Sequence, residues 1–275
     1  MDILGSGRGL ASSLALEALR LGLWLLILSA IFVPLERMFA LHPQRVLRRG
    51  AGADLACYFL NGLLTNLLLV MPMAALGALL HRAVPGAVHA AAAGLPLGAR
   101  LLAALVVGEI GFYWGHRWSH EIPILWRFHA VHHSPEQIDW LVNTRAHPVD
   151  ILFTRLCGFV PLYALGLAGA TTSRADLAPV LIVLAGTVWG FFIHANLRWR
   201  FGWLEWLVST PAFHRWHHTN DEHRDRNYAS MLPWLDWLFG TLHLPKAAWP
   251  PNYGIDAALS PRLARQLLRP LAEPR

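Results

Sequence analysis

Histidines in three short clusters are the residues of this chain whose type and spacing could do chemistry. They are His116 and His120, then His129, His132 and His133, and finally His214, His217 and His218. Residues three and four apart share one face of a helix, so each cluster would present its imidazoles together. Imidazoles buried side by side are costly when protonated or unpaired, and a metal ion removes that cost by binding a neutral ring nitrogen. The spacing therefore predicts a metal site.

The number of histidines favours two metal ions over one. Eight imidazoles exceed the four ligands of a tetrahedral zinc site, and they would give two ions about four or five ligands each. His147 and His194 are further candidate ligands, because the predicted helices return both to the same side of the membrane as the clusters. Asp150 lies three residues after His147, and we expect it to orient that ring.

The metal type is less narrowly determined by these residues. Imidazole suits zinc, iron, copper and nickel. A di-zinc site, structural or hydrolytic, is the main alternative to a redox-active pair, although the sequence has no H-E-x-x-H motif to supply the usual general base. Haem held by two histidines would leave the repeated H-x-x-H-H pattern unexplained. Two irons in an all-imidazole shell could activate O2.

Three polar residues are predicted to support the ligands. Glu109 lies in an apolar run, seven residues or about two helical turns before His116, and therefore on the same side of the helix. An ionisable residue at that depth is costly and by default functional. We predict that Glu109 accepts a hydrogen bond from a ligand imidazole. We expect similar supporting roles for Asn196 and Asp236.

The composition places these clusters in a membrane protein. Hydrophobic residues make up 55% of the 275 residues and charged residues only 15%, against about 25% charged in soluble proteins. Thirteen tryptophans suit the membrane interface, and a net charge of +6 suits anionic headgroups. We do not expect nucleic-acid binding, because the arginines form no basic stripe. The two cysteines lie in apolar stretches, where a disulfide framework is not expected.

Five apolar runs are candidate membrane helices, and a span needs roughly 20 residues. The runs cover residues 14–32, 55–80, 101–114, 151–170 and 177–193. The last two form a predicted helical hairpin broken at residues 171–176, whose first half carries Arg155 and is either spanning or re-entrant. A cleaved signal peptide is disfavoured, because only Arg8 precedes the first run as a basic residue.

The distribution of arginine predicts which side the clusters face. Arg37, Arg45, Arg48 and Arg49 follow the first run, whereas the loop at residues 84–97 is almost uncharged. The positive-inside rule places the arginine-rich loop in the cytosol. Counting spans from that loop returns every histidine cluster to the cytosolic face.

The chain reads as one membrane domain, residues 1–275. Its polar, aromatic segments at 121–150 and 198–245 are predicted to form short helices that cap the cytosolic face. The predicted parts are N-terminal transmembrane helices at 1–115, the first two clusters at 116–150, the hairpin at 151–196, the cap with the third cluster at 197–245, and an amphipathic or frayed tail at 246–275.

These motifs resemble the histidine boxes of the fatty acid hydroxylase/sterol desaturase superfamily of membrane oxygenases. That family's pattern is H-x(3,4)-H followed by two copies of H-x(2,3)-H-H, and the resemblance covers roughly residues 103–244. Flanking residues also match: Tyr113 and Trp114 before the first box, Phe128 before the second, Thr210 and Pro211 before the third, and the later run at 235–241.

The resemblance implies an all-α membrane fold, with about four to five transmembrane helices beneath a cytosolic cap. It implies two iron ions, with zinc possible as purified, and O2 as co-substrate for hydroxylating or desaturating a fatty acyl or sterol-like lipid. It further implies a separate electron donor, either cytochrome b5-like or a ferredoxin with its reductase, because this sequence has no fused cytochrome b5-like domain. A bacterial inner membrane is the expected location.

Overall fold

The computed structural model is helical throughout its regular elements. It describes residues 7–167, 178–257, 260 and 262–272. Across these residues the only β-type pairings are two isolated bridges, Ala40 with Leu197 and Thr219 with Tyr253. The all-α prediction is therefore confirmed for the part of the chain that the structure describes.

Five long helices correspond to the five predicted apolar runs. They are α1 (Gly7–Phe39), α2 (Ala51–Ala83), α4 (Leu97–Glu121), α6 (Pro148–Ala164) and α7 (Ala178–His194). The predicted hairpin break at residues 171–176 lies outside the described residues. The short elements are α3 (Gly86–Ala93), α5 (Pro123–His133), η1 (Trp140–Thr144), η2 (Gly202–Trp206), α8 (Pro211–His217), α9 (Trp234–Leu238) and α10 (Leu263–Ala272).

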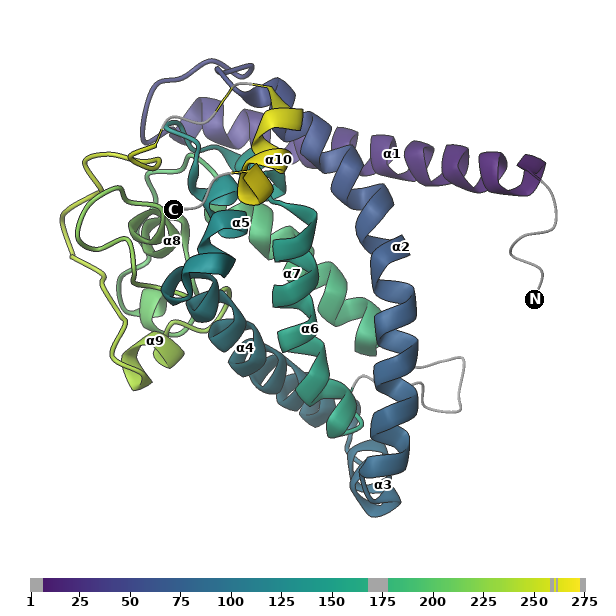
Figure 1. Cartoon of the computed structure of the whole chain (residues 1–275). Helices are drawn as coiled ribbons and strands as arrows, with labels where there is room; N and C mark the ends of the chain where they lie inside the picture. Colours follow the sequence, from purple (N-terminus) through teal and green to yellow (C-terminus); the bar gives the residue numbers. More distant parts are fainter. Residues whose placement is uncertain (1–6, 168–177, 258–259, 261, 273–275) are drawn as a thin grey trace.

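The long helices form a bundle with the short ones gathered at one end. Helix α6 packs between α4 and α2, and α7 also contacts α4. The cap helices α5, α8 and α9 lie beside the upper end of α4, while α10 packs on α5 (Figure 1). Helix α1 contacts α2 and extends away from the rest of the bundle (Figure 1).

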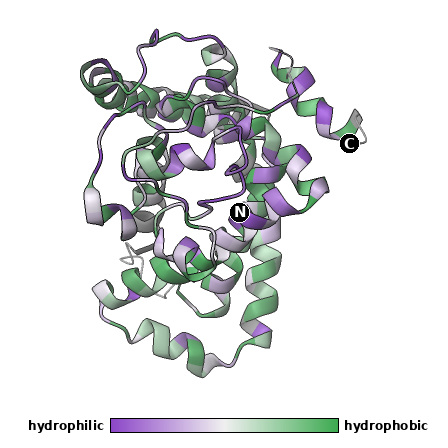
Figure 2. Ribbon diagram, turned by 90° about the vertical axis from the view of Figure 1, so that its left-hand side faces the viewer, coloured by the Kyte–Doolittle hydropathy of each residue, from purple (hydrophilic) through white to green (hydrophobic). Residues whose placement is uncertain are grey.

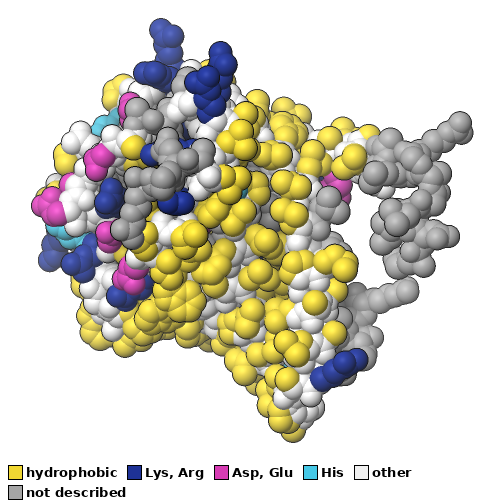
Figure 3. All heavy atoms as spheres, viewed as in Figure 1, with side chains coloured by type: hydrophobic (Ala, Val, Ile, Leu, Met, Phe, Trp, Pro, Cys, Tyr) yellow, Lys and Arg dark blue, Asp and Glu magenta, His cyan; other side chains and the backbone are white. Residues whose placement is uncertain are grey.

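Hydrophobic surface covers the helical part of the molecule. The long helices are mainly hydrophobic, while hydrophilic colour concentrates in the cap loops (Figure 2). Acidic, basic and histidine side chains gather on the cap side in Figure 3. Among the described residues, two stretches are long and apolar enough to cross a membrane, Ser12–Phe39 and Leu97–Glu121, and α2 and α7 contain shorter apolar stretches. These features support membrane association, whereas the number of spans stays a prediction.

Glycines allow α4 and α6 to approach closely. A Cβ atom at Gly111 would lie 2.2 Å from the carbonyl oxygen of Cys157, and one at Gly115 would lie 2.7 Å from the Cys157 Cβ. Small residues serve this purpose in membrane helix pairs, where contact depends on packing. The close approach brings His116, the next residue of α4, towards the start of α6.

A buried ion network ties the loop before α2 to the cap. The Arg48 guanidinium donates to Asp139 at 2.7 Å and to Asp54 at 2.5 Å, and Arg145 also pairs with Asp54. Buried charges need such partners. Arg48, which the orientation argument counted as a loop charge, is therefore a structural residue, and that argument rests on Arg37, Arg45 and Arg49.

Candidate metal centre

The three histidine clusters lie on helix ends at the cap, as their spacing predicts. His116 and His120 occupy the last turns of α4, and the second cluster forms the last turn of α5. The third cluster lies on α8 and the residue that follows it. Thr210 caps α8, its Oγ1 accepting from the Phe213 amide at 3.3 Å, which is a favoured way to begin a helix.

The structure brings nine of the ten predicted histidines together in two buried groups. In each group, one nitrogen from every histidine lies within 4.8 Å of those of the others. The five-histidine group comprises His116, His120, His129, His133 and His217, and the four-histidine group comprises His132, His194, His214 and His218. The groups adjoin, because the rings of His133 and His218 have centroids 4.5 Å apart.

The second and third clusters are each divided between the two groups. His132 turns to the four-histidine group, while its neighbours in the cluster turn to the five-histidine group. Likewise, His217 belongs to the five-histidine group, whereas His214 and His218 belong to the four-histidine group. Consecutive residues on a helix point about 100° apart, so a single helix end can supply ligands to two adjacent sites.

Backbone carbonyls orient four of the rings through Nδ1. In each case the carbonyl can only accept, so Nδ1 carries the proton and Nε2 presents a lone pair to the group. The pairs are His116 with Tyr228 at 2.6 Å, His132 with Arg145 at 2.9 Å, His194 with Gly190 at 2.7 Å and His217 with Arg226 at 2.9 Å.

Carboxylates orient two more rings. Asp150 Oδ2 accepts from His129 Nδ1 at 3.0 Å, with both side chains buried, and Asp225 Oδ1 accepts from His120 Nδ1 at 3.1 Å, with the aspartate 59% exposed. The expectation that Asp150 orients His147 was wrong, because on α6 its carboxylate faces the five-histidine group.

The facing ring nitrogens suit a cation between them. His132 and His194 both donate from Nδ1, so neither has a proton on Nε2 when neutral, yet their Nε2 atoms lie 3.3 Å apart. The Nε2 atoms of His214 and His218 lie 2.9 and 3.2 Å from that of His194. In the five-histidine group, Nε2 of His217 is buried with no hydrogen-bond partner among the described residues. The residues therefore fit a metal ion in each group.

Burial keeps the cap histidines in the form that binds metal. It lowers the pKa of His132 to about 4. The pKa values of His133, His214, His217 and His218 also fall well below the usual 6.5, again mainly through burial. Neutral imidazole is the metal ligand, so these rings do not need to lose a proton at neutral pH.

His147 does not reach either group. Its Nδ1 accepts from the Val149 amide at 3.1 Å, capping α6, and its Nε2 donates to the Leu267 carbonyl of α10 at 3.1 Å. Both ring nitrogens are thus engaged away from the centre. The structure gives His147 a role in docking α10 and does not support it as a ligand.

Glu109 and Asp236 support the centre through the backbone. Contrary to the prediction, Glu109 bonds no imidazole among the described residues: its Oε2 accepts from the amides of Met231 and Leu232 at 2.8 and 3.2 Å. Asp236 accepts from the Tyr228 and Ala229 amides at 2.7 and 2.9 Å, and burial raises its pKa to about 6. The two carboxylates therefore fix the segment whose Tyr228 carbonyl orients His116.

Asn196 organises the end of α7 and, among the described residues, makes no hydrogen bond to a histidine of either group. Its amide group pairs with the backbone of His42, donating at 2.7 Å and accepting at 3.2 Å. Its Oδ1 also accepts from the buried Arg215 at 3.1 Å. Asn196 thereby holds the chain two residues after His194 against the loop that follows α1.

Sequence reasoning missed the groups that hold the rings through carbonyl oxygens. A backbone carbonyl has no residue signature, so nothing in the sequence marks Gly190, Arg226 or Tyr228. Asp54 gives a weak signal, as an acid at the start of an apolar helix. Its buried pairing with Arg145 anchors the carbonyl that orients His132.

A cavity of about 400 Å³ opens from the histidine groups between α4, α6 and α7. Five of the nine histidines line it: His116, His129, His132, His194 and His214. Towards the far ends of the helices the lining becomes apolar, with Leu105, Phe112, Phe159 and Leu162. The arrangement can present a long hydrocarbon to two metal ions.

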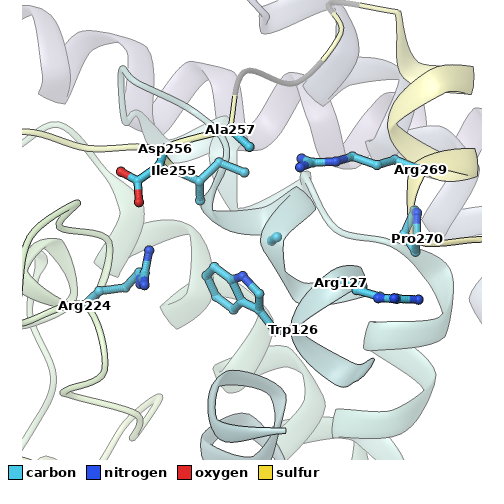
Figure 4. A pocket seen from close by; sticks show the side chains of 9 residues that line it. Trp126, Arg127, Arg224, Ile255, Asp256, Ala257, Arg269 and Pro270 are labelled. Atoms are coloured by element: carbon cyan, nitrogen blue, oxygen red, sulfur yellow. The ribbon is translucent and has the colours of Figure 1, made fainter. Parts of the chain in front are cut away.

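A second pocket, of about 320 Å³, lies over Trp126 (Figure 4). The tryptophan ring contacts His120 and His133 of the five-histidine group, with centroids 5.1 and 5.5 Å apart. The pocket is lined by Asp256 and three arginines: Arg127 of α5, Arg224 of the segment that follows α8, and Arg269 of α10. Trp126 thus stands between an arginine-lined surface pocket and one of the histidine groups.

Comparison with known proteins identifies a family model and several relatives. The model described as fatty acid hydroxylase matches residues 101–241. An ornithine lipid hydroxylase, OlsE, of Rhizobium tropici is 37% identical over 182 residues, covering 65% of this chain and 51% of that protein. An alkylglycerol monooxygenase of Danio rerio is 33% identical, covering 48% of this chain and 28% of that protein.

A methylsterol monooxygenase 2-2 of Arabidopsis thaliana is 30% identical, covering 53% of each chain. The chain thus spans about half the length, or less, of the curated relatives it matches. No solved structure matches it. The region that the family model matches contains all three histidine clusters of this chain, because His116 to His218 lie within residues 101–241.

Proposed function

The chain belongs to the fatty acid hydroxylase family, and on that basis we propose that it is a membrane di-iron enzyme that uses O2 to hydroxylate or desaturate a lipid. One observation carries the proposal: nine buried histidines form two adjoining groups at the end of a largely apolar cavity. When bound there, the two irons would supply O2 activation and the oxidising power to break an unactivated C–H bond.

The chain's own residues hold, orient and shield the metals. Nine imidazoles supply the ligands, while the carbonyls and Asp150 fix which nitrogen faces each ion. The buried cap keeps bulk water from the reacting carbon. For hydroxylation, a C–H bond and O2 give an alcohol and one water, with two electrons and two protons consumed. Desaturation uses the same O2, two electrons and two protons, removes two hydrogens from the lipid and gives a carbon–carbon double bond and two waters.

The substrate is a membrane lipid that enters the cavity between α4, α6 and α7. The names of the relatives, an ornithine lipid hydroxylase, an alkylglycerol monooxygenase and a methylsterol monooxygenase, all refer to lipids. An ornithine lipid is the first candidate, because that relative shares the longest match among the three. Fatty acyl and sterol-like lipids are the others.

Electrons come from a separate donor, cytochrome b5-like or a ferredoxin with its reductase, at the cytosolic face of a bacterial inner membrane. The pocket over Trp126 gives such a protein an approach to the five-histidine group through the ring of Trp126 (Figure 4). Three arginines there suit a donor with acidic side chains around its redox centre. An Arg224→Glu variant should bind the donor more weakly, and its donor binding should depend less on salt concentration. Reduction of the metal centre by dithionite, which needs no donor protein, should be unchanged.

Metal content and O2 use test the proposal. Protein purified anaerobically in detergent should contain about two irons per chain by elemental mass spectrometry. Mössbauer spectra should show the irons oxidised by O2, and His132→Ala and His217→Ala should each lose metal from one group. Two zinc ions that iron cannot replace, with no O2 consumption, would favour a structural or hydrolytic di-zinc protein instead.

A further inference from the structure

Arg155 is a cation that lines the proposed substrate cavity, and its side chain is exposed in that cavity. It lies on α6 and lines the cavity with Ile151, Thr154, Gly158 and Phe159, which recur on one face of the helix. It follows Asp150 by five residues, about 7.5 Å along the helix axis. Along the helix axis, Arg155 therefore lies between the residues that face the histidine groups and the apolar Phe159 and Leu162.

None of the residues that the structure describes supplies a counterion for this arginine. Arg155 makes no hydrogen bond, ion pair or cation–π contact with any residue that the structure describes. The two carboxylates that line the same cavity are already engaged, Glu109 with backbone amides and Asp150 with His129. Arginine stays protonated in proteins, and an unpaired charge in apolar surroundings is costly. An anionic ligand would supply the partner that the described residues do not.

We propose that Arg155 binds the anionic group, carboxylate or phosphate, of the lipid that occupies the cavity. The planar guanidinium suits both groups, because it donates two parallel hydrogen bonds to their oxygens. The role of that lipid as substrate rests on the proposed function. The hydrocarbon chain of a lipid held in this way would lie along Phe159 and Leu162. The carbons closest to its charged group would then be the ones nearest the histidines.

Binding of matched amphiphiles tests the site without turnover. Metal-loaded full-length protein in the neutral detergent dodecyl maltoside is titrated with laurate, dodecyl phosphate and dodecanol, which share one chain length. We expect at least one anionic probe to bind ten-fold or more tightly than dodecanol. Arg155→Met should abolish that preference, whereas Arg155→Lys should keep part of it. Arg82→Met is the matched control, because Arg82 lies on membrane helix α2 outside the cavity.

The outcomes separate the possible sources of the anion. A preference for laurate indicates a lipid with a carboxylate, and a preference for dodecyl phosphate indicates a lipid with a phosphate. Displacement of either probe by acetate or inorganic phosphate at equal concentration would mean that the site takes free anions, and it would overturn the lipid assignment. Equal binding of all three probes, or a preference that survives in Arg155→Met, would overturn the proposal. If the preference holds but the iron-loaded protein consumes no O2, the anion site stands and the oxygenase function fails.

Discussion

Replacing Asp150 by Asn should selectively weaken the five-histidine group. The Asp150 carboxylate accepts from His129 Nδ1 at 3.0 Å and from the Ser119 hydroxyl at 3.3 Å, and it is buried with both partners. Asn keeps the size but removes the charge, so the hydrogen bond that holds the His129 ring becomes weaker. Losing such a partner of a ligating histidine typically costs 10- to 100-fold in metal affinity, about 1.4–2.8 kcal/mol.

The chain offers a matched control in the other carboxylate pair. Asp225 accepts from His120 Nδ1 at nearly the same distance, 3.1 Å, but it is 59% exposed. Solvent screens an exposed pair, so Asp225→Asn should cost less than ten-fold. Metal is measured by elemental mass spectrometry after dialysis against graded chelator, and Asp150→Asn should plateau near one ion per chain. Equal losses in the two variants, or loss of both ions together from Asp150→Asn, would refute the reasoning.

Three further predictions concern packing, the excluded histidine and pH. Gly111→Ala should markedly lower the melting temperature in detergent, because its Cβ would meet the Cys157 carbonyl at 2.2 Å, whereas Gly98→Ala, with nothing within 4 Å, should not. His147→Ala should leave metal content unchanged; loss of an ion on elemental analysis would restore it as a ligand. Burial lowers the pKa of His132 to about 4, so the unfolded chain binds more protons between that pH and 6.5. Denaturant titration of metal-free protein should therefore show stability falling as pH drops through this window, by up to about 1.4 kcal/mol per unit for each such histidine. Asp236 acts in the opposite direction, because its raised pKa makes the folded state bind a proton first, but the histidines with a lowered pKa outnumber it. Stability that is flat or rises would contradict the assignment.

The sequence by itself predicted a histidine-built site and most of the histidines that the structure brings together. Spacings of three and four residues place side chains on one helix face whatever the tertiary structure, so the three boxes and their metal-binding character could be read locally. His194 was also found, because it ends an apolar run whose length fixes where the chain leaves the bundle. Long apolar runs likewise predicted the five long helices.

Only the tertiary structure decided how the histidines are shared and held. Which of two groups a ring joins depends on helices distant in the sequence, so His132 and His133 separate although they are adjacent. The same long-range packing places Asp150 beside His129 and His147 against α10. It also places the backbone carbonyls of Gly190, Arg226 and Tyr228 beside the histidine rings. Local spacing fixes a side chain's direction from its own helix, but its partners come from segments tens to a hundred residues away, whose placement depends on the packing of the whole bundle.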